Sequence, residues 1–95
     1  MEKNRQLNGY INIAHKAGYL IIGSDKLKGY NKKLYIVIYD TSAQKNTLKV
    51  VEEMKNKNIP IFAVENLAEL TNISNCKIVG IKNKDISEII ANILK

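Results

Sequence analysis

The run LYIVIY, Leu34–Tyr39, constrains the fold more than any other segment of the sequence. It is apolar without alternation and rich in β-branched residues, so it predicts a strand that is covered on both faces. A strand of this kind belongs to a sheet that carries helices on either side. The rest of the chain must therefore supply further strands together with the helices that cover them.

Helical and strand-like segments alternate along the whole chain. Apolar residues at helical spacing between Leu7 and Ala17 predict a first helix, which Gly18 is placed to end. Further strands are predicted at Tyr19–Ile22, within the run NKNIPIFAV with Pro60 near the start of the strand, and at Cys76–Ile81. The order α-β-α-β-α-β-α-β-α indicates a three-layer α/β/α sandwich with a single four-stranded sheet and helices on both faces. Residues 1–95 are expected to form one domain.

Side chains that cap helices are predicted at the start of the second and third helices. Ser24 or Asp25 could cap a second helix of only one or two turns, since Gly29 follows so soon. Asp40–Ser42 offers side-chain oxygens to the free N–H groups of a third helix. The buried face of that third helix is predicted to contain Thr47, Val50, Val51 and Met54.

Two more helices are predicted in the second half of the chain. Glu65–Leu70 is expected to form a short one, followed by a loop. In the last helix, Asp85 and Glu88 have the spacing of a capping box. Its buried face is predicted to consist of Ile86, Ile89, Ile90 and Ile93.

Basic side chains are concentrated at the front of the chain. The chain has 15 lysine and arginine residues against 9 aspartate and glutamate residues, a net charge of +6. Residues 1–33 hold seven of the basic and two of the acidic residues, which gives this part +5. The segment Lys26–Lys33 alone contains four lysines and no acid. Such asymmetry indicates a surface for a polyanion. A solvated lysine-rich surface that binds nothing is the alternative.

The sequence offers little for metal, disulfide or cofactor chemistry. His15 is the one histidine and Cys76 the one cysteine, so we expect neither a metal site nor an internal disulfide. Glycine-rich nucleotide-binding motifs and HExxH are absent, and no cofactor is expected. There is no apolar run of about eighteen residues and no signal-peptide pattern. We therefore expect a cytoplasmic protein that does not associate with a membrane.

Asp40 directly follows the buried strand, a position that phospho-acceptor and metal-binding aspartates occupy in other α/β folds. Such sites need partner acids, and none stands at a similar strand end. Helix capping explains Asp40 better. We therefore expect no enzymatic activity, and a small enzyme or phospho-acceptor built on Asp40 is the minor alternative.

Two long segments together resemble a known family. The run INIAHKAGYLIIGSDKLK resembles the first helix, strand and glycine turn of the kink-turn RNA-binding superfamily. The run LYIVIYDTSAQKNTLKVVEEMKNKNIPIFAVENLAEL resembles the family's second strand, third helix, and the strand and helix that follow. The superfamily includes archaeal and eukaryotic large-subunit ribosomal proteins, box C/D ribonucleoprotein core proteins and small bacterial relatives of the YlxQ type. The resemblance covers nearly the whole chain, and AGYLIIG, DTSAQKNT and IPIF in this order carry it.

The resemblance also implies where RNA would bind. In the family, a glycine, two polar residues that read guanine edges and a lysine begin the second helix, and a loop before the last strand adds contacts. Carried over by position, these residues are Gly23, Ser24, Asp25, Lys26, Lys28, Asn72, Ile73 and Ser74. The basic segment after the glycine adds Lys32 and Lys33.

The sequence departs from the family at two motifs. Asp25 and Lys26 replace the family's base-reading Asn-Glu pair, and Glu69-Leu70-Thr71 lacks the glycine of the ELG motif. An aspartate can accept hydrogen bonds from a guanine edge, but it also repels phosphate. The resemblance therefore predicts the location of the site better than its base specificity.

The charge pattern and the resemblance together imply a non-enzymatic, ribosomal-protein-like RNA-binding protein. A glycine lets backbone N–H groups approach phosphates, helix N-termini prefer anions, and lysines neutralise phosphates without reading sequence. The implied partner is structured RNA of the kink-turn type, in a ribosome or another ribonucleoprotein. A protein-interaction module of the same fold, with weak or no RNA binding, is the alternative.

Overall fold

The computed structural model describes residues 2–95 and confirms the predicted three-layer α/β/α sandwich. The elements occur in the predicted order: α1 Glu2–Lys16, β1 Leu20–Ile22, α2 Ser24–Lys28, β2 Ile36–Asp40, α3 Lys45–Asn56, β3 Ile61–Val64, α4 Leu67–Thr71, β4 Ile78–Ile81 and α5 Lys84–Leu94. None of the helices within residues 2–95 is both long enough and apolar enough to cross a membrane.

The four strands are ordered β1-β4-β2-β3 in one mixed sheet. β2 pairs in parallel with β3, while β4 runs antiparallel to both β1 and β2. Consequently β1, β2 and β3 finish at the end of the sheet where β4 begins. Hydrogen bonds from Gly23 N–H to the Ile78 carbonyl (3.1 Å) and from Asp40 N–H to the Lys77 carbonyl (2.8 Å) hold these strand ends together. At the opposite end, β2 and β3 begin and β4 finishes.

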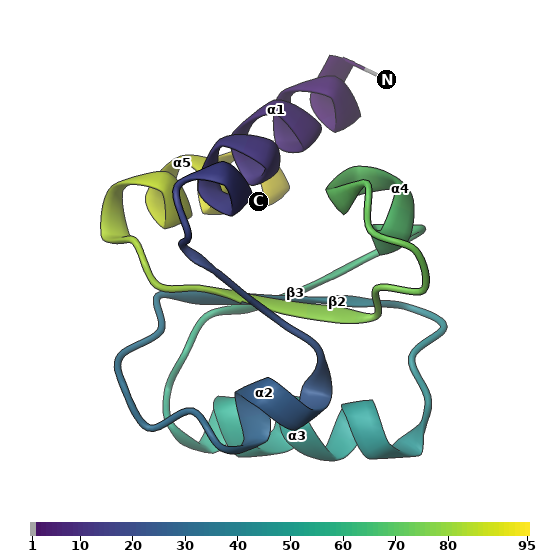
Figure 1. Cartoon of the computed structure of the whole chain (residues 1–95), viewed down its shortest axis with the longest axis vertical. Helices are drawn as coiled ribbons and strands as arrows, with labels where there is room; N and C mark the ends of the chain where they lie inside the picture. Colours follow the sequence, from purple (N-terminus) through teal and green to yellow (C-terminus); the bar gives the residue numbers. More distant parts are fainter. Residues whose placement is uncertain (1) are drawn as a thin grey trace.

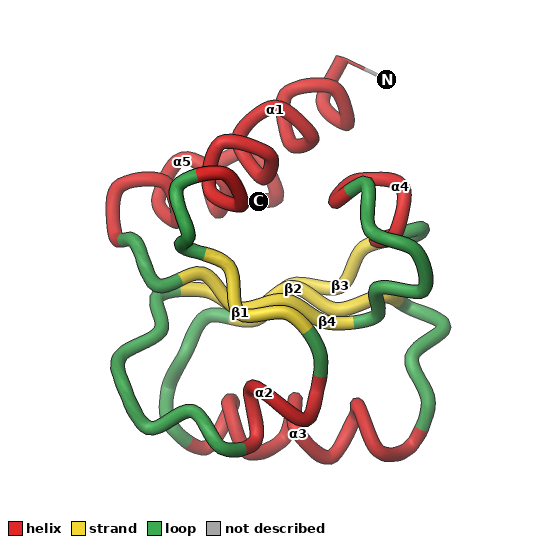
Figure 2. Tube along the Cα trace, viewed as in Figure 1, coloured by secondary structure: helices red, strands yellow, loops and turns green. Residues whose placement is uncertain are grey.

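The helices divide unequally between the two faces of the sheet. Figures 1 and 2 show α1, α4 and α5 on one face, and α2 and α3 on the other. Along β2, Ile36 and Ile38 belong to the core beneath α1 and α5, whereas Val37 belongs to the core beneath α3. All three are fully buried. The prediction that this strand is covered on both faces is therefore confirmed.

Gly80 in β4 gives the short helix α2 a place to pack. A Cβ atom at Gly80 would lie 2.8 Å from Cδ2 of Leu27 and 3.2 Å from Cδ2 of Leu34. Leu27 is the buried residue of α2. A helix of five residues is too short to be stable on its own hydrogen bonds. The contact of Leu27 with the sheet at Gly80 therefore anchors α2.

The start of α5 differs from its prediction. Asn83 is the N-cap, and its side-chain oxygen accepts a hydrogen bond of 2.9 Å from the N–H of Ile86. The predicted capping box of Asp85 and Glu88 is wrong, because Asp85 already lies inside the helix. Asparagine is as good an N-cap as aspartate, and Asn83 precedes the helix at the required position.

The buried face of α5 is also rotated relative to its prediction. Ile90 is fully buried, but Ile89 is 40% exposed and does not belong to the inner face. Ser87 is buried instead, with 2% of its surface exposed. The isoleucine pattern alone cannot distinguish the two faces. Ile86, Ile90 and Ile93 belong both to the predicted face, which adds Ile89, and to the observed one, which adds Ser87.

Candidate functional site

β1 turns into α2 at Gly23. The backbone angles of this residue are φ 94° and ψ 150°, a combination that is essentially restricted to glycine. Its N–H donates to the Ile78 carbonyl, and its own carbonyl accepts from the N–H of Leu27 at 3.1 Å. Gly23 is itself the N-cap of α2, and no side chain caps this helix. The predicted cap by Ser24 or Asp25 is wrong because both residues already lie in the first turn.

The backbone at Gly23 leads to a stability prediction. Gly23→Ala is expected to lower the free energy of unfolding by about 2 kcal/mol, because alanine must adopt a strained backbone there. Apart from Gly23 and its two chain neighbours, no described residue has an atom within 4 Å of the added Cβ, so crowding would contribute nothing. Gly29→Ala is the matched control, because Gly29 has ordinary helical angles (φ −89°, ψ −1°) and equally open surroundings. Urea unfolding that finds equal stabilities for the two variants would contradict the role of Gly23.

A shallow hollow lies where β1 ends and β4 begins. Its volume is about 230 Å³, and its lining includes residues from the starts of α2 and α3 and from the loop before β4. We call the lining residues the Gly23 corner: Ile22, Gly23, Ser24, Thr47, Ile73, Ser74, Asn75, Cys76, Lys77 and Ile78. The structure thus brings together two pairs of residues of the predicted RNA site that are far apart in the sequence, Gly23–Ser24 and Ile73–Ser74.

The first turn of α3 contributes positive potential to the Gly23 corner. α3 begins at Lys45 after the N-cap Gln44, with no side-chain cap bond and no acid in its first turn. The free N–H groups at the start of a helix of this length carry a positive partial charge, to which Lys45 adds a full one. Thr47, in the same turn, lines the hollow. The prediction that Asp40–Ser42 caps this helix is wrong.

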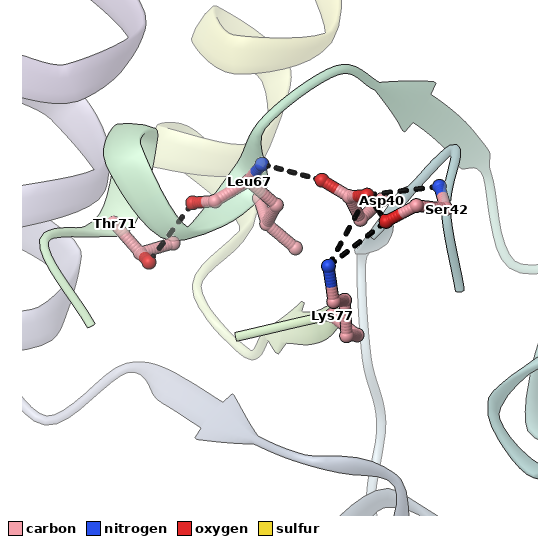
Figure 3. A network of polar contacts seen from close by, with 5 residues as sticks. All are labelled: Asp40, Ser42, Leu67, Thr71 and Lys77. Atoms are coloured by element: carbon pink, nitrogen blue, oxygen red, sulfur yellow. Dashed lines mark hydrogen bonds and ion pairs between the residues drawn. The ribbon is translucent and has the colours of Figure 1, made fainter. Parts of the chain in front are cut away.

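Asp40 instead caps α4. Its Oδ1 accepts a hydrogen bond of 2.7 Å from the N–H of Leu67, the first residue of α4 (Figure 3). Its Oδ2 accepts from both the backbone N–H and the hydroxyl of Ser42. Lys77 Nζ lies 3.7 Å from Oδ2 and donates to Ser42 Oγ at 2.8 Å. The side chain of Asn66, the N-cap residue of α4, makes no cap bond. Asp40, at the end of β2, supplies one instead.

These donors determine the ionisation of Asp40. The hydrogen bond from the Ser42 hydroxyl, followed by those from the N–H groups of Leu67 and Ser42, holds the pKa of Asp40 well below its usual range. Burial acts in the opposite direction but is outweighed. The carboxylate therefore remains charged at neutral pH, with hydrogen bonds at both oxygens. This arrangement favours the capping interpretation of Asp40 over a reactive one.

Three other predicted residues lie on α2, beside the hollow. Asp25 and Lys28 line a groove of about 480 Å³ that separates α2 from α3. Lys49 and Glu53 line the same groove from α3. Lys26 is exposed to solvent. The two carboxylates reduce the positive charge of the groove, so the positive potential is expected to be stronger at the hollow itself.

The remaining predicted residues are directed elsewhere. Asn72 lies toward α1, where its Nδ2 donates to Oδ1 of Asn12 over 3.5 Å. Lys32 and Lys33 lie at the opposite end of the sheet, where they share a hollow with Lys57. The contiguous basic segment of the sequence is therefore divided in space, because α2 and the loop that follows it carry the chain from one end of the sheet to the other (Figure 1).

Sequence reasoning missed Thr47, Asn75 and Lys77 as members of the corner. Asn75 adjoins the predicted loop and could have been included with it. Lys77 is placed opposite Asp40 by the antiparallel pairing of β4 with β2, which no local signal reveals. Thr47 was assigned only to the buried face of its helix, whereas it is partly exposed.

The remaining single residues have unremarkable surroundings. His15 is exposed near the end of α1. Cys76 is buried in the loop before β4, and burial raises the pKa of its thiol. Tyr30 is partly buried and packs at the margin of the core beneath α2 and α3. Within residues 2–95, no three His, Cys, Asp or Glu side chains gather as a metal ion would require.

Comparison with known proteins finds similarity in structure alone. No family model and no curated protein matches the sequence. A Bacillus halodurans protein of unknown function has a similar structure, with a TM-score of 0.81 and 21% identity over 93% of this chain and 95% of that one. A Giardia lamblia 15.5 kD RNA-binding protein has a TM-score of 0.75 and 19% identity over 99% of this chain and 86% of that one. At these identities the similarity shows a shared fold.

Proposed function

We propose that this protein binds structured RNA of the kink-turn type at the Gly23 corner, without enzymatic activity and as part of a ribosome or another ribonucleoprotein. The observation that carries the proposal is the convergence of Gly23, the uncapped start of α3 and the Ile73–Asn75 loop around one hollow. The RNA-binding protein of Giardia with the same fold supports it.

The groups around the hollow match the chemistry of a sharply bent RNA. Backbone N–H groups and Lys45 at the start of α3 offer charge-assisted hydrogen bonds to phosphates. The side chains of Ser24, Ser74 and Asn75 offer donors and acceptors for the exposed edges of splayed bases. Ile73 provides an apolar contact for a base or sugar. Asp25 faces the neighbouring groove, so in our proposal Ser24 is the main base-contacting residue of α2.

RNA binding by the unmodified protein is the direct test. We expect the protein to shift a labelled kink-turn RNA in a native gel at low salt, and to bind it at least about tenfold more tightly than a plain duplex of equal length. The affinity should fall steeply between about 50 and 200 mM salt, because each phosphate contact releases counterions. Absence of binding to either RNA at low salt would refute the proposal, and equal binding to both would refute its kink-turn specificity.

A protein-interaction module is the alternative, and exposed apolar side chains favour it. Ile13 on α1 and Ile89 on α5 are 54% and 40% exposed, and these two helices pack against each other. A pull-down from lysate, with and without nuclease, separates the two functions. RNA binding predicts that the captured partners are lost after nuclease treatment, whereas an interaction module predicts that they persist.

A further inference from the structure

Two adjoining hollows lie at the end of the sheet opposite Gly23, where β2 and β3 begin. Their volumes are about 390 and 290 Å³, and they share Lys33, Leu34 and Asn58. Backbone hydrogen bonds fix this region, from Tyr35 N–H to the Ile81 carbonyl (3.0 Å) and from Val37 N–H to the Pro60 carbonyl (2.9 Å). In Figure 1 this end of the molecule is on the left, and the Gly23 corner is on the right.

Four lysines from three separate segments surround the two hollows, which we call together the lysine basin. Lys32 and Lys33 precede β2, Lys57 follows α3, and Lys84 begins α5. Among the residues that the structure describes, Glu88 is the one acidic residue in the lining of either hollow. Lys84 occupies the first position of its helix, where the macrodipole disfavours a cation, so it adds to a potential that is already positive. This concentration of charge complements a polyanion.

The floor of the lysine basin is apolar and includes an aromatic ring. Leu34, Ile59, Pro60 and Ala91 line it, so a flat apolar group could rest there. Tyr35 lines the hollow of about 290 Å³, and Lys33 Nζ lies 5.2 Å from the centre of its ring. In proteins that bind single strands, an aromatic ring in a basic groove provides the face on which an unpaired base stacks, and nearby cations meet its phosphate.

Ser87 provides a further polar group at this site. It lies in the wall of the hollow, is 2% exposed, and its hydroxyl has no hydrogen-bond partner within residues 2–95. Buried hydroxyls are normally paired, because an unpaired one has lost its bonds to water without replacement. The oxygen itself is covered by the protein, so a base edge or ribose hydroxyl in the hollow would form the missing bond after the Ser87 side chain turns toward it.

We propose that the lysine basin is a second RNA-binding surface, independent of the Gly23 corner, which holds an unpaired strand. The four lysines contact its phosphates, and the floor around Tyr35 and Pro60 supports one or two bases. The proposal rests on the proposed function only for the class of partner. With both surfaces occupied, the protein joins a structured RNA element to a single-stranded one across the length of the sheet.

The test is binding of a fluorescent eight-nucleotide single-stranded RNA to the full chain, followed by fluorescence anisotropy. We expect binding at low salt, and a similar affinity when excess unlabelled kink-turn RNA is present. Lys33→Glu combined with Lys84→Glu should weaken binding of the oligonucleotide about 100-fold, since each lost phosphate contact costs about tenfold near 0.1 M salt. Tyr35→Leu should weaken it about tenfold through loss of stacking.

Each outcome separates this proposal from the one for the Gly23 corner. Lys26→Glu with Lys45→Glu is the matched control, with the same change of charge at the other end, and should leave binding of the oligonucleotide within about twofold. Oligonucleotide binding that persists without any binding of kink-turn RNA would support the lysine basin and refute the corner. Full competition between the two RNAs, equal displacement by polyglutamate and by unlabelled oligonucleotide, or no effect of Tyr35→Leu would overturn the inference.

Discussion

Asp40→Asn is expected to lower the free energy of unfolding by about 3 kcal/mol. The substitution preserves the size of the side chain but removes the charge and replaces one acceptor oxygen with a donor NH₂ group. The Leu67 and Ser42 donors then compete for the single remaining acceptor, and Lys77 loses its ion partner. Hydrogen bonds to a buried charged group are each worth about 1.5–3 kcal/mol, and Asp40 is only 4% exposed. Urea or thermal unfolding measures the loss.

Asp85→Asn is the matched control for that experiment. Asp85 is an exposed acid in the first turn of α5. Its favourable interaction with the helix N-terminus is worth at most about 1 kcal/mol. Equal losses of stability for the two variants would show that the network around Asp40 contributes little beyond a surface charge.

The pH dependence of stability provides a second measurement of the same carboxylate. The pKa of Asp40 is lower in the folded protein than the value of about 3.9 expected for an unfolded chain. The unfolded state therefore takes up the proton first as the pH falls. The stabilisation is complete above about pH 5 and is lost progressively below about pH 4. The stability difference between the native protein and Asp40→Asn should therefore be constant from pH 7 to about pH 5 and shrink toward about pH 2.

Local signals were sufficient to predict the architecture. The uninterrupted β-branched run around Ile36–Ile38 required cover on both faces, and alternation of helix and strand patterns supplied it. Helix starts were harder, because several polar residues stood near each one. At α5 the cap is Asn83, two positions before the expected Asp85. Short side chains with oxygen atoms are nearly equivalent as caps, so only the position where the backbone turns decides between them.

The candidate site was predictable only where chain neighbours remain neighbours in space. Gly23 and Ser24 line one hollow with Ile73 and Ser74, and only the resemblance gave a reason to group these two segments from the sequence. Lys33 was grouped with them by sequence, but α2 and the following loop carry it to the other end of the sheet. The contact of Lys77 with Asp40 depends on strand pairing between segments nearly forty residues apart, which periodicity does not encode.

Reversing two charges near the Gly23 corner should weaken binding of structured RNA about 100-fold without unfolding the protein. In Lys26→Glu combined with Lys45→Glu, each lysine lost removes a phosphate contact that is worth about tenfold near 0.1 M salt. A glutamate at position 45 would be in the first turn of α3, which now has no acid, so it interacts favourably with the helix dipole. The melting temperature should therefore stay constant or rise by about 3 °C or less.

The same substitution at the other end of α3 distinguishes a specific contact from an effect of net charge. Lys55 lies in the last turn of α3, at the far end of the helix from Lys45, and a lysine there stabilises the helix. Lys55→Glu should lower the melting temperature slightly and change the affinity for kink-turn RNA by about twofold or less. Binding and stability thus move in opposite directions at the two ends of α3. If Lys55→Glu weakened RNA binding as much as Lys45→Glu, the attraction would be a general property of the lysine-rich surface, and the Gly23 corner would not be the RNA site.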